Sequence, residues 1–199
     1  MTAGLILASG SEIRQNLLRN AGVSFTAMPV KIDEAAIRDA MVAENAHPRD
    51  IADQLAEFKA RKAAQKRPEA VVLGCDQVLA IGRDILAKPQ SVDEAKDQIT
   101  RMNGRSHQLL SAAVIYEDGQ PVWRHVGVVK LHMRQVDPGY LDDYLARNWD
   151  SIRHSVGGYK LEEEGVRLFH RIEGDYFNVL GLPLLELLSY LTLKGIIPG

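Results

Sequence analysis

"LILASGSEIRQNLL", residues 5–18, is the stretch that decides the fold. It begins with an apolar run of strand length, residues 5–8, and continues into a small, hydroxyl-rich turn. Apolar residues then recur with helical spacing until Gly22, a residue type that often ends helices. The stretch therefore predicts a strand, a tight turn and a helix, which together form the first unit of an α/β fold.

The rest of the chain continues this alternation of apolar runs and helical patterns. No linker, repeat or low-complexity segment interrupts it, so we expect one mixed-sheet domain spanning residues 1–199. The patterns predict further strands at 24–29, 70–74, 78–81, 111–116, 122–133, 168–172 and 177–180, and helices at 34–44, 48–66, 91–104, 138–148 and 184–193.

Composition restricts the function classes. The chain has 199 residues, 46% of them hydrophobic and 25% charged, with a formal net charge of -2, which argues against a nucleic-acid or membrane partner. Its one cysteine, Cys75, excludes an intrachain disulfide framework and suits a reducing compartment. No apolar run is long enough for a signal peptide or a spanning helix. We therefore expect a cytoplasmic enzyme or binding protein.

The turn after the first strand is a candidate anion site. Backbone N–H groups at the start of a helix point outward where the helix dipole is positive, and Ser9 and Ser11 add two hydroxyls. Arg14, one turn into the helix, is placed to add a bidentate contact to phosphate oxygens. The alternative is that Ser11 is only a helix cap and Arg14 a solvated surface residue.

Two acidic positions and two lysines are further candidates. Asp76 follows an apolar strand directly, where ligands of α/β sheets gather, which favours a role in metal binding or base catalysis; the alternative is an Asx turn. Glu34 stands at the start of a predicted helix, where acidic residues are favoured for dipole reasons alone. Lys59 and Lys88 supply positive charge, and the alternative for each is a solvated side chain.

Taken together, these residues resemble a known family. The set Ser9-x-Ser11-x-x-Arg14, Asp33-Glu34, Glu57-x-Lys59-Ala60, Gly74-x-Asp76, Lys88-Pro89 and Gly181-Leu182-Pro183 is similar to that of the Maf family of nucleotide pyrophosphatases. The resemblance implies an elongated mixed sheet flanked by helices, with a central cleft between two lobes, as in inosine triphosphate pyrophosphatases. It also implies homodimers that hydrolyse nucleoside triphosphates to monophosphate and pyrophosphate with a divalent metal, Mg²⁺ or Mn²⁺.

The resemblance also implies residue roles. Glu34 becomes the main metal ligand and Asp76 the base that activates water, with Asp76 also able to bind the metal and the two roles interchangeable at this point. Lys59 and Lys88 neutralise charge that moves to the leaving pyrophosphate. The residues that cradle phosphate oxygens are Ser9, Ser11 and Arg14.

Departures from the commonest family pattern concern the base. Gln77 and the segment Tyr159-Lys160-Leu161-Glu162 resemble the branch that favours 7-methylguanosine triphosphate. A carboxylate such as Glu162 accepts hydrogen bonds from a guanine edge. Three consecutive glutamates, 162–164, leave the register of this base reader open, and a solvated loop is the alternative.

A second function class stays open from sequence. Maf proteins are also linked to septum formation, so a regulator that binds nucleotide without turnover is the alternative to a hydrolase. The retained carboxylates Glu34 and Asp76 favour hydrolysis, because binding a polyanion does not require them. His107, in a loop that the family often carries, is expected at the surface, and the alternative is that it approaches the ligand.

Overall fold

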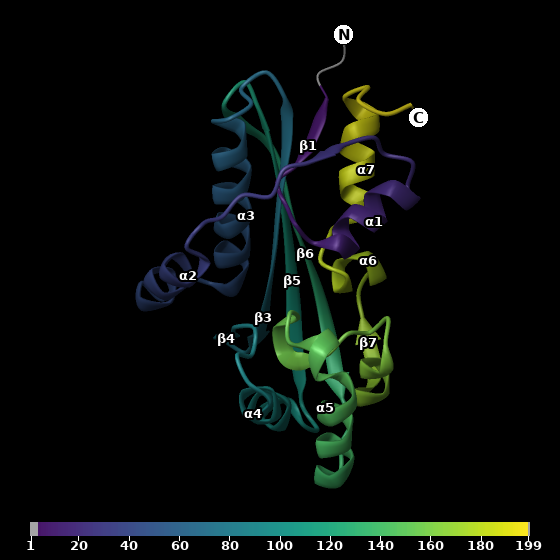
Figure 1. Ribbon diagram of the computed structural model, residues 1–199. Helices are drawn as coiled ribbons and strands as arrows, with labels where there is room; N and C mark the ends of the chain where they lie inside the picture. Colours follow the sequence, from purple (N-terminus) through teal and green to yellow (C-terminus); the bar gives the residue numbers. More distant parts are fainter. Residues whose placement is uncertain (1–3, 199) are drawn as a thin grey trace. The chain divides into compact units, whose positions relative to one another are not determined.

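The computed structural model describes residues 4–198, so both ends of the predicted domain lie outside the described range. Its helices and strands are interspersed along the chain, as expected of an α/β protein (Figure 1). The strands are β1 Leu5–Leu7, β2 Thr26–Ala27, β3 Val71–Ile81, β4 Asp84–Leu86, β5 Ser106–Glu117, β6 Gln120–Met133 and β7 Phe169–Glu173. The α-helices are α1 Glu12–Asn20, α2 Glu34–Ala43, α3 Pro48–Ala64, α4 Val92–Met102, α5 Pro138–Ile152, α6 Tyr176–Val179 and α7 Leu184–Leu193, with 3₁₀ turns at Val156–Gly158 and Glu164–Leu168.

The strands form one mixed sheet of seven strands. Its order is β2-β1-β3-β5-β6-β7, with β4 paired to β3. Strand β1 is parallel to β2 and β3, whereas the β3/β4 and β6/β7 pairs are antiparallel. The α/β class and the mixed sheet predicted from the sequence are therefore confirmed.

The described chain divides into two compact units. One contains residues up to Gln77, Leu110–Gly127 and residues from Asp175 onward, and the other contains Val78–Leu109 and Val128–Gly174. The long strands β3, β5 and β6 contribute residues to both units. The single domain with a cleft between two lobes stays a prediction.

In the first unit, β3 carries helices on both faces. Leu73 and Cys75 point into a core shared with α1 and α7. Gly74, on the opposite face, lies against α3: a Cβ built there would stand 2.3 Å from Ala56 O and 2.5 Å from Ala60 N. Because glycine has no side chain, α3 packs directly on the strand.

The second unit has a buried aromatic centre. His107 is 2% exposed and lies among Tyr159 and Phe169, with its Nε2 2.7 Å from the Tyr159 hydroxyl. Burial lowers the pKa of His107 to about 4. The prediction of a surface histidine is wrong, because β5 starts at Ser106 and places this side chain in the core.

Two other sequence predictions are also wrong. The runs at 70–74 and 78–81 are not separate strands but parts of one strand, β3. Residues 177–180 are not a strand: Asp175 caps the short helix α6 by accepting a hydrogen bond from Asn178 N at 3.0 Å. In the described part of the chain, no helix is both long and apolar enough to cross a lipid bilayer.

Candidate active site

The loop between β1 and α1 is ordered by its own hydroxyls and by Arg14. Ser11 caps α1 and accepts from Arg14 N at 3.5 Å, while the buried Ser9 Oγ accepts from Ser11 N at 3.2 Å. The Arg14 guanidinium donates to Gly181 O at 2.7 Å, and to Ser9 Oγ and Cys75 O at 3.4 Å each. Ser11 is thus a helix cap as the alternative had it, but Arg14 is not a solvated residue.

Asp76 lies beyond the point where β1 stops. Strand β1 ends at Leu7, opposite Leu73, and Ala8 N donates to Leu73 O at 2.8 Å. The β3 chain continues past this point, so Asp76 stands at the carboxyl end of the parallel pair although it is within β3 itself. The Asx-turn alternative is therefore wrong, because Asp76 lies within a continuous strand. A role for Asp76 in catalysis or metal binding stays a prediction.

Lys59 joins the two carboxylates that the sequence singled out. Its Nζ lies 2.7 Å from Glu34 Oε1 and 2.6 Å from Asp76 Oδ1. The side chains of Lys59 and Asp76 are each 10% exposed, and that of Glu34 is 48% exposed. Helix α3 supplies the lysine, the start of α2 supplies Glu34 and β3 supplies Asp76. One ammonium is therefore shared by a buried and a half-exposed carboxylate.

This donor set is suited to a cation that also binds phosphate. Among residues 4–198 no group of three or more His, Cys, Asp or Glu side chains is gathered as a metal cage. Magnesium is commonly held by one or two carboxylates together with substrate phosphates and water. Glu34 and Asp76 each place a carboxylate oxygen beside the same Lys59 nitrogen, so the two carboxylates are close enough to fit that mode of binding.

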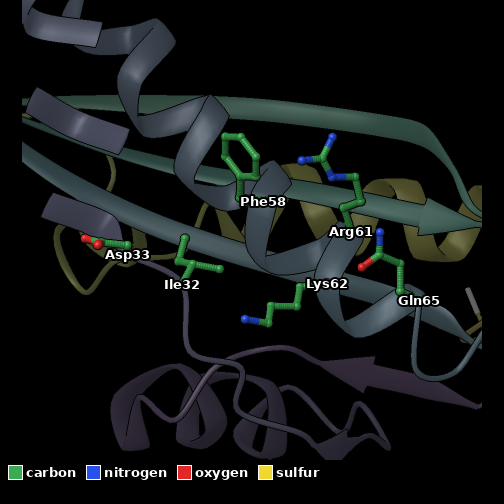
Figure 2. Close-up of a pocket in the computed structure, with 6 residues that line it drawn as sticks. All are labelled: Ile32, Asp33, Phe58, Arg61, Lys62 and Gln65. Atoms are coloured by element: carbon green, nitrogen blue, oxygen red, sulfur yellow. The ribbon is translucent and has the colours of Figure 1, made fainter. Parts of the chain in front are cut away.

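A pocket of about 360 Å³ is lined by residues that are sequence neighbours of Glu34 and Lys59. Figure 2 shows its lining, in which Asp33 directly precedes Glu34, and Phe58 directly precedes Lys59. The Arg61 guanidinium lies over the Phe58 ring, 4.6 Å from its centroid. Sequence reasoning had singled out Asp33 beside Glu34 but missed the lining residues of α3, for which the helical spacing of cations close to Lys59 is a signal. The residues that line the pocket are Ile32, Asp33, Phe58, Arg61, Lys62 and Gln65.

Gln77 points to the other face of β3 from Asp76, since successive residues of a strand alternate. Its Nε2 lies 2.9 Å from Ser111 Oγ, and 3.0 Å from both Asn178 O and Val179 O. Its amide nitrogen is therefore bound within the protein, and its role in binding substrate stays a prediction.

Lys88 and Glu162 belong to the second unit. Lys88 is exposed between β4 and α4, and its carbonyl accepts from Gln90 Nε2 at 3.0 Å. Glu162 is also exposed, in a turn whose two following glutamates bind other protein groups. Glu163 accepts from Ser151 and Lys160, and Glu164 accepts from side chains of α5. The roles of Lys88 and Glu162 stay predictions.

The Maf-like protein family model matches residues 4–193. The nucleoside triphosphate pyrophosphatase of Ruegeria pomeroyi is 62% identical over 197 residues, covering 99% of each chain. That of Roseobacter denitrificans is 62% identical over 198 residues, covering 100% of each chain. The 7-methyl-GTP pyrophosphatase of Mesorhizobium japonicum is 45% identical over 199 residues, again covering 100% of each. This chain belongs to the Maf family.

Proposed function

We propose that this chain is a hydrolase that cleaves nucleoside triphosphates to nucleoside monophosphate and pyrophosphate. The observation that carries the proposal is that Glu34 and Asp76 share the Lys59 ammonium. Asp76 lies beyond the end of β1, the strand that leads into the Ser9 to Arg14 loop. Relatives named nucleoside triphosphate pyrophosphatase support the reaction class. A site that only bound a polyanion would gain nothing from two carboxylates.

In the proposed reaction, water attacks the α-phosphorus and the bond from that phosphorus to the oxygen bridging to the β-phosphorus breaks. Asp76 accepts the proton of the attacking water, and pyrophosphate leaves with the bridging oxygen. Lys59 holds the Asp76 carboxylate in place through its 2.6 Å contact. Ser9, Ser11 and Arg14 bind phosphate oxygens, and Lys88 adds positive charge for the leaving group.

A divalent cation, Mg²⁺ or Mn²⁺, completes this proposal. When bound, the cation screens the negative charge of the triphosphate and polarises its oxygens. Glu34 is the exposed member of the carboxylate pair and would supply its first ligand, with Asp76 as the second. We also propose that the enzyme is cytoplasmic and works as a homodimer. Light scattering of the purified protein measures the oligomeric state.

For the base, we propose a preference for 7-methylguanosine triphosphate read by Glu162. Relatives bearing that name support it, although relatives of higher identity bear the general name. The turn supports the register: Glu163 binds Ser151, and Glu164 binds Tyr140, Arg147 and Asn148. Of the three glutamates, Glu162 therefore has the carboxylate that is available to a ligand.

The test is pyrophosphate release from 7-methylguanosine, guanosine, thymidine, uridine and inosine triphosphates with Mg²⁺ or Mn²⁺. We expect Asp76→Asn to lower kcat by about a hundredfold or more, the effect of removing a general base. Asp39→Asn is the control for loss of a carboxylate, because Asp39 is an exposed residue of α2 that pairs with Arg38. Nucleotide binding without pyrophosphate release in any of these reactions would instead favour the regulator.

A further inference from the structure

We propose that Ser111 and the backbone carbonyls of residues 178 and 179 fix the orientation of the Gln77 amide, so that Gln77 offers the substrate only a hydrogen-bond acceptor. This makes Ser111 a positioning residue for base selection. The inference rests on the proposed function, because it takes the ligand of this face to be the base of a nucleotide.

Three oxygen atoms surround the Gln77 amide nitrogen. They are Ser111 Oγ at 2.9 Å, Asn178 O at 3.0 Å and Val179 O at 3.0 Å. The Ser111 hydroxyl donates its own hydrogen to Asn178 O at 2.6 Å, so it presents lone pairs to Gln77. A carbonyl oxygen in place of the nitrogen would face acceptors only. The rotated amide is therefore excluded, and Oε1 points away from these oxygens.

The acceptors are themselves held in place. Asp175 Oδ2 accepts from Asn178 N at 3.0 Å and from Asn178 Nδ2 at 3.1 Å. Asn178 is 4% exposed, and its side chain occupies the space where a Cβ on Gly127 would stand. Ser111 is fully buried on β5. Gln77 thus meets a rigid set of carbonyl groups.

The same segment also anchors the proposed phosphate ligand. Arg14 Nε donates to Gly181 O at 2.7 Å, two residues after the Val179 carbonyl that binds Gln77. Residues 178–181 therefore lie against Arg14 at one end and Gln77 at the other. Gln77 is partly exposed, and within residues 4–198 no donor reaches its Oε1. A nucleotide whose phosphates reach Arg14 would present its base to an acceptor fixed on this segment.

A fixed acceptor selects bases that carry N–H donors. Guanine has such donors on its pairing edge, at N1 and the exocyclic amine, whereas unsubstituted purine has acceptors only. The ligand class expected at Gln77 is therefore a nucleotide with an amide-type or amino N–H on the base. Loss of one such hydrogen bond changes affinity by about tenfold.

The experiment measures binding rather than turnover, using guanosine 5′-monophosphate and purine riboside 5′-monophosphate with isothermal calorimetry. The readout is the ratio of their Kd values in wild type, Gln77→Met, Ser111→Ala and the double variant. We expect wild type to prefer the guanosine nucleotide, Gln77→Met to reduce the preference by about tenfold, and Ser111→Ala to reduce it by about threefold. In the Gln77→Met background, Ser111→Ala is expected to change the ratio no further.

Ser189→Ala is the matched control, because Ser189 Oγ also donates to a backbone carbonyl, that of Leu185, at 2.9 Å. An equal loss of affinity for both nucleotides in Ser111→Ala, or an additive double variant, would overturn the inference and leave Ser111 a structural residue. So would a preference that Gln77→Met leaves unchanged. Because binding is measured without turnover, failure of the hydrolase proposal gives a different result: a retained binding preference with no pyrophosphate released.

Discussion

The Lys59 ammonium and the Asp76 carboxylate form a buried ion pair, with Nζ 2.6 Å from Oδ1 and each side chain 10% exposed. The pair links the packing of α3 on β3 to the proposed chemistry, because neither charge is stable at this depth without the other. Glu34 adds a second carboxylate at 2.7 Å from the same nitrogen. The charge balance of the site therefore depends on one lysine.

Lys59→Met leaves Asp76 as an uncompensated buried charge. We expect the free energy of unfolding to fall by about 3 kcal/mol, the usual cost of breaking a buried pair from one side. Adding Asp76→Asn removes the charge and should recover most of that loss. Urea denaturation of both variants measures this, and a double variant no more stable than Lys59→Met would contradict it.

Gly74→Ala tests the direct packing of α3 on β3. The new Cβ would lie 2.3 Å from Ala56 O, 2.5 Å from Ala60 N and 2.8 Å from Ala60 Cβ, so helix backbone must move. We expect a loss of about 2–3 kcal/mol of stability, at the upper end for overpacking. Gly4→Ala is the control, since nothing lies within 4 Å of its added Cβ. Equal melting temperatures for the two variants would refute the packing argument.

His107 should make stability depend on pH. Burial, with a smaller contribution from His132, lowers its pKa from 6.5 to about 4, so the folded chain holds it neutral while the unfolded chain protonates it first. The contribution of neutral His107 to the free energy of unfolding is therefore fully present above pH 6.5 and is lost as the pH decreases toward 4. Urea denaturation at pH 7, 6 and 5 should show a smaller decline for His107→Gln than for wild type. Parallel declines in the two proteins would exclude His107 as the source.

Two of the glutamates at 162–164 should have different roles: Glu162 in selecting the base and Glu164 in stabilising the turn. Hydrogen bonds from Arg147 and Asn148 lower the pKa of Glu164 to about 2, so Glu164→Gln should lower the melting temperature. Glu162 is exposed, and Glu162→Gln should change the preference among nucleoside triphosphates without changing the melting temperature. Scanning fluorimetry and the pyrophosphate assay measure the two effects. A change in base preference confined to Glu164→Gln would reverse the assignment.

The local sequence pattern was enough to predict secondary structure where that structure depends on residues adjacent in the sequence. The strand, turn and helix at residues 5–20 follow from apolar spacing and from Ser11 as a cap, and the structure confirms them. Pattern failed at residues 177–180, because Asp175 caps a helix there and overrides the strand-like composition. It also failed between Gly74 and Val78, where residues typical of turns continue a strand.

The sequence by itself determined the class of fold and the residue types of the site, because apolar periodicity and charged motifs are written along the chain. Only the tertiary structure decided which groups meet. Lys59 and Asp76 are 17 positions apart, and Gln77 and Asn178 are 101 apart, so their contacts exist only when α3, β3 and α6 pack together. Burial then gives these contacts their strength, since a charge or an amide removed from water must find its partner within the protein.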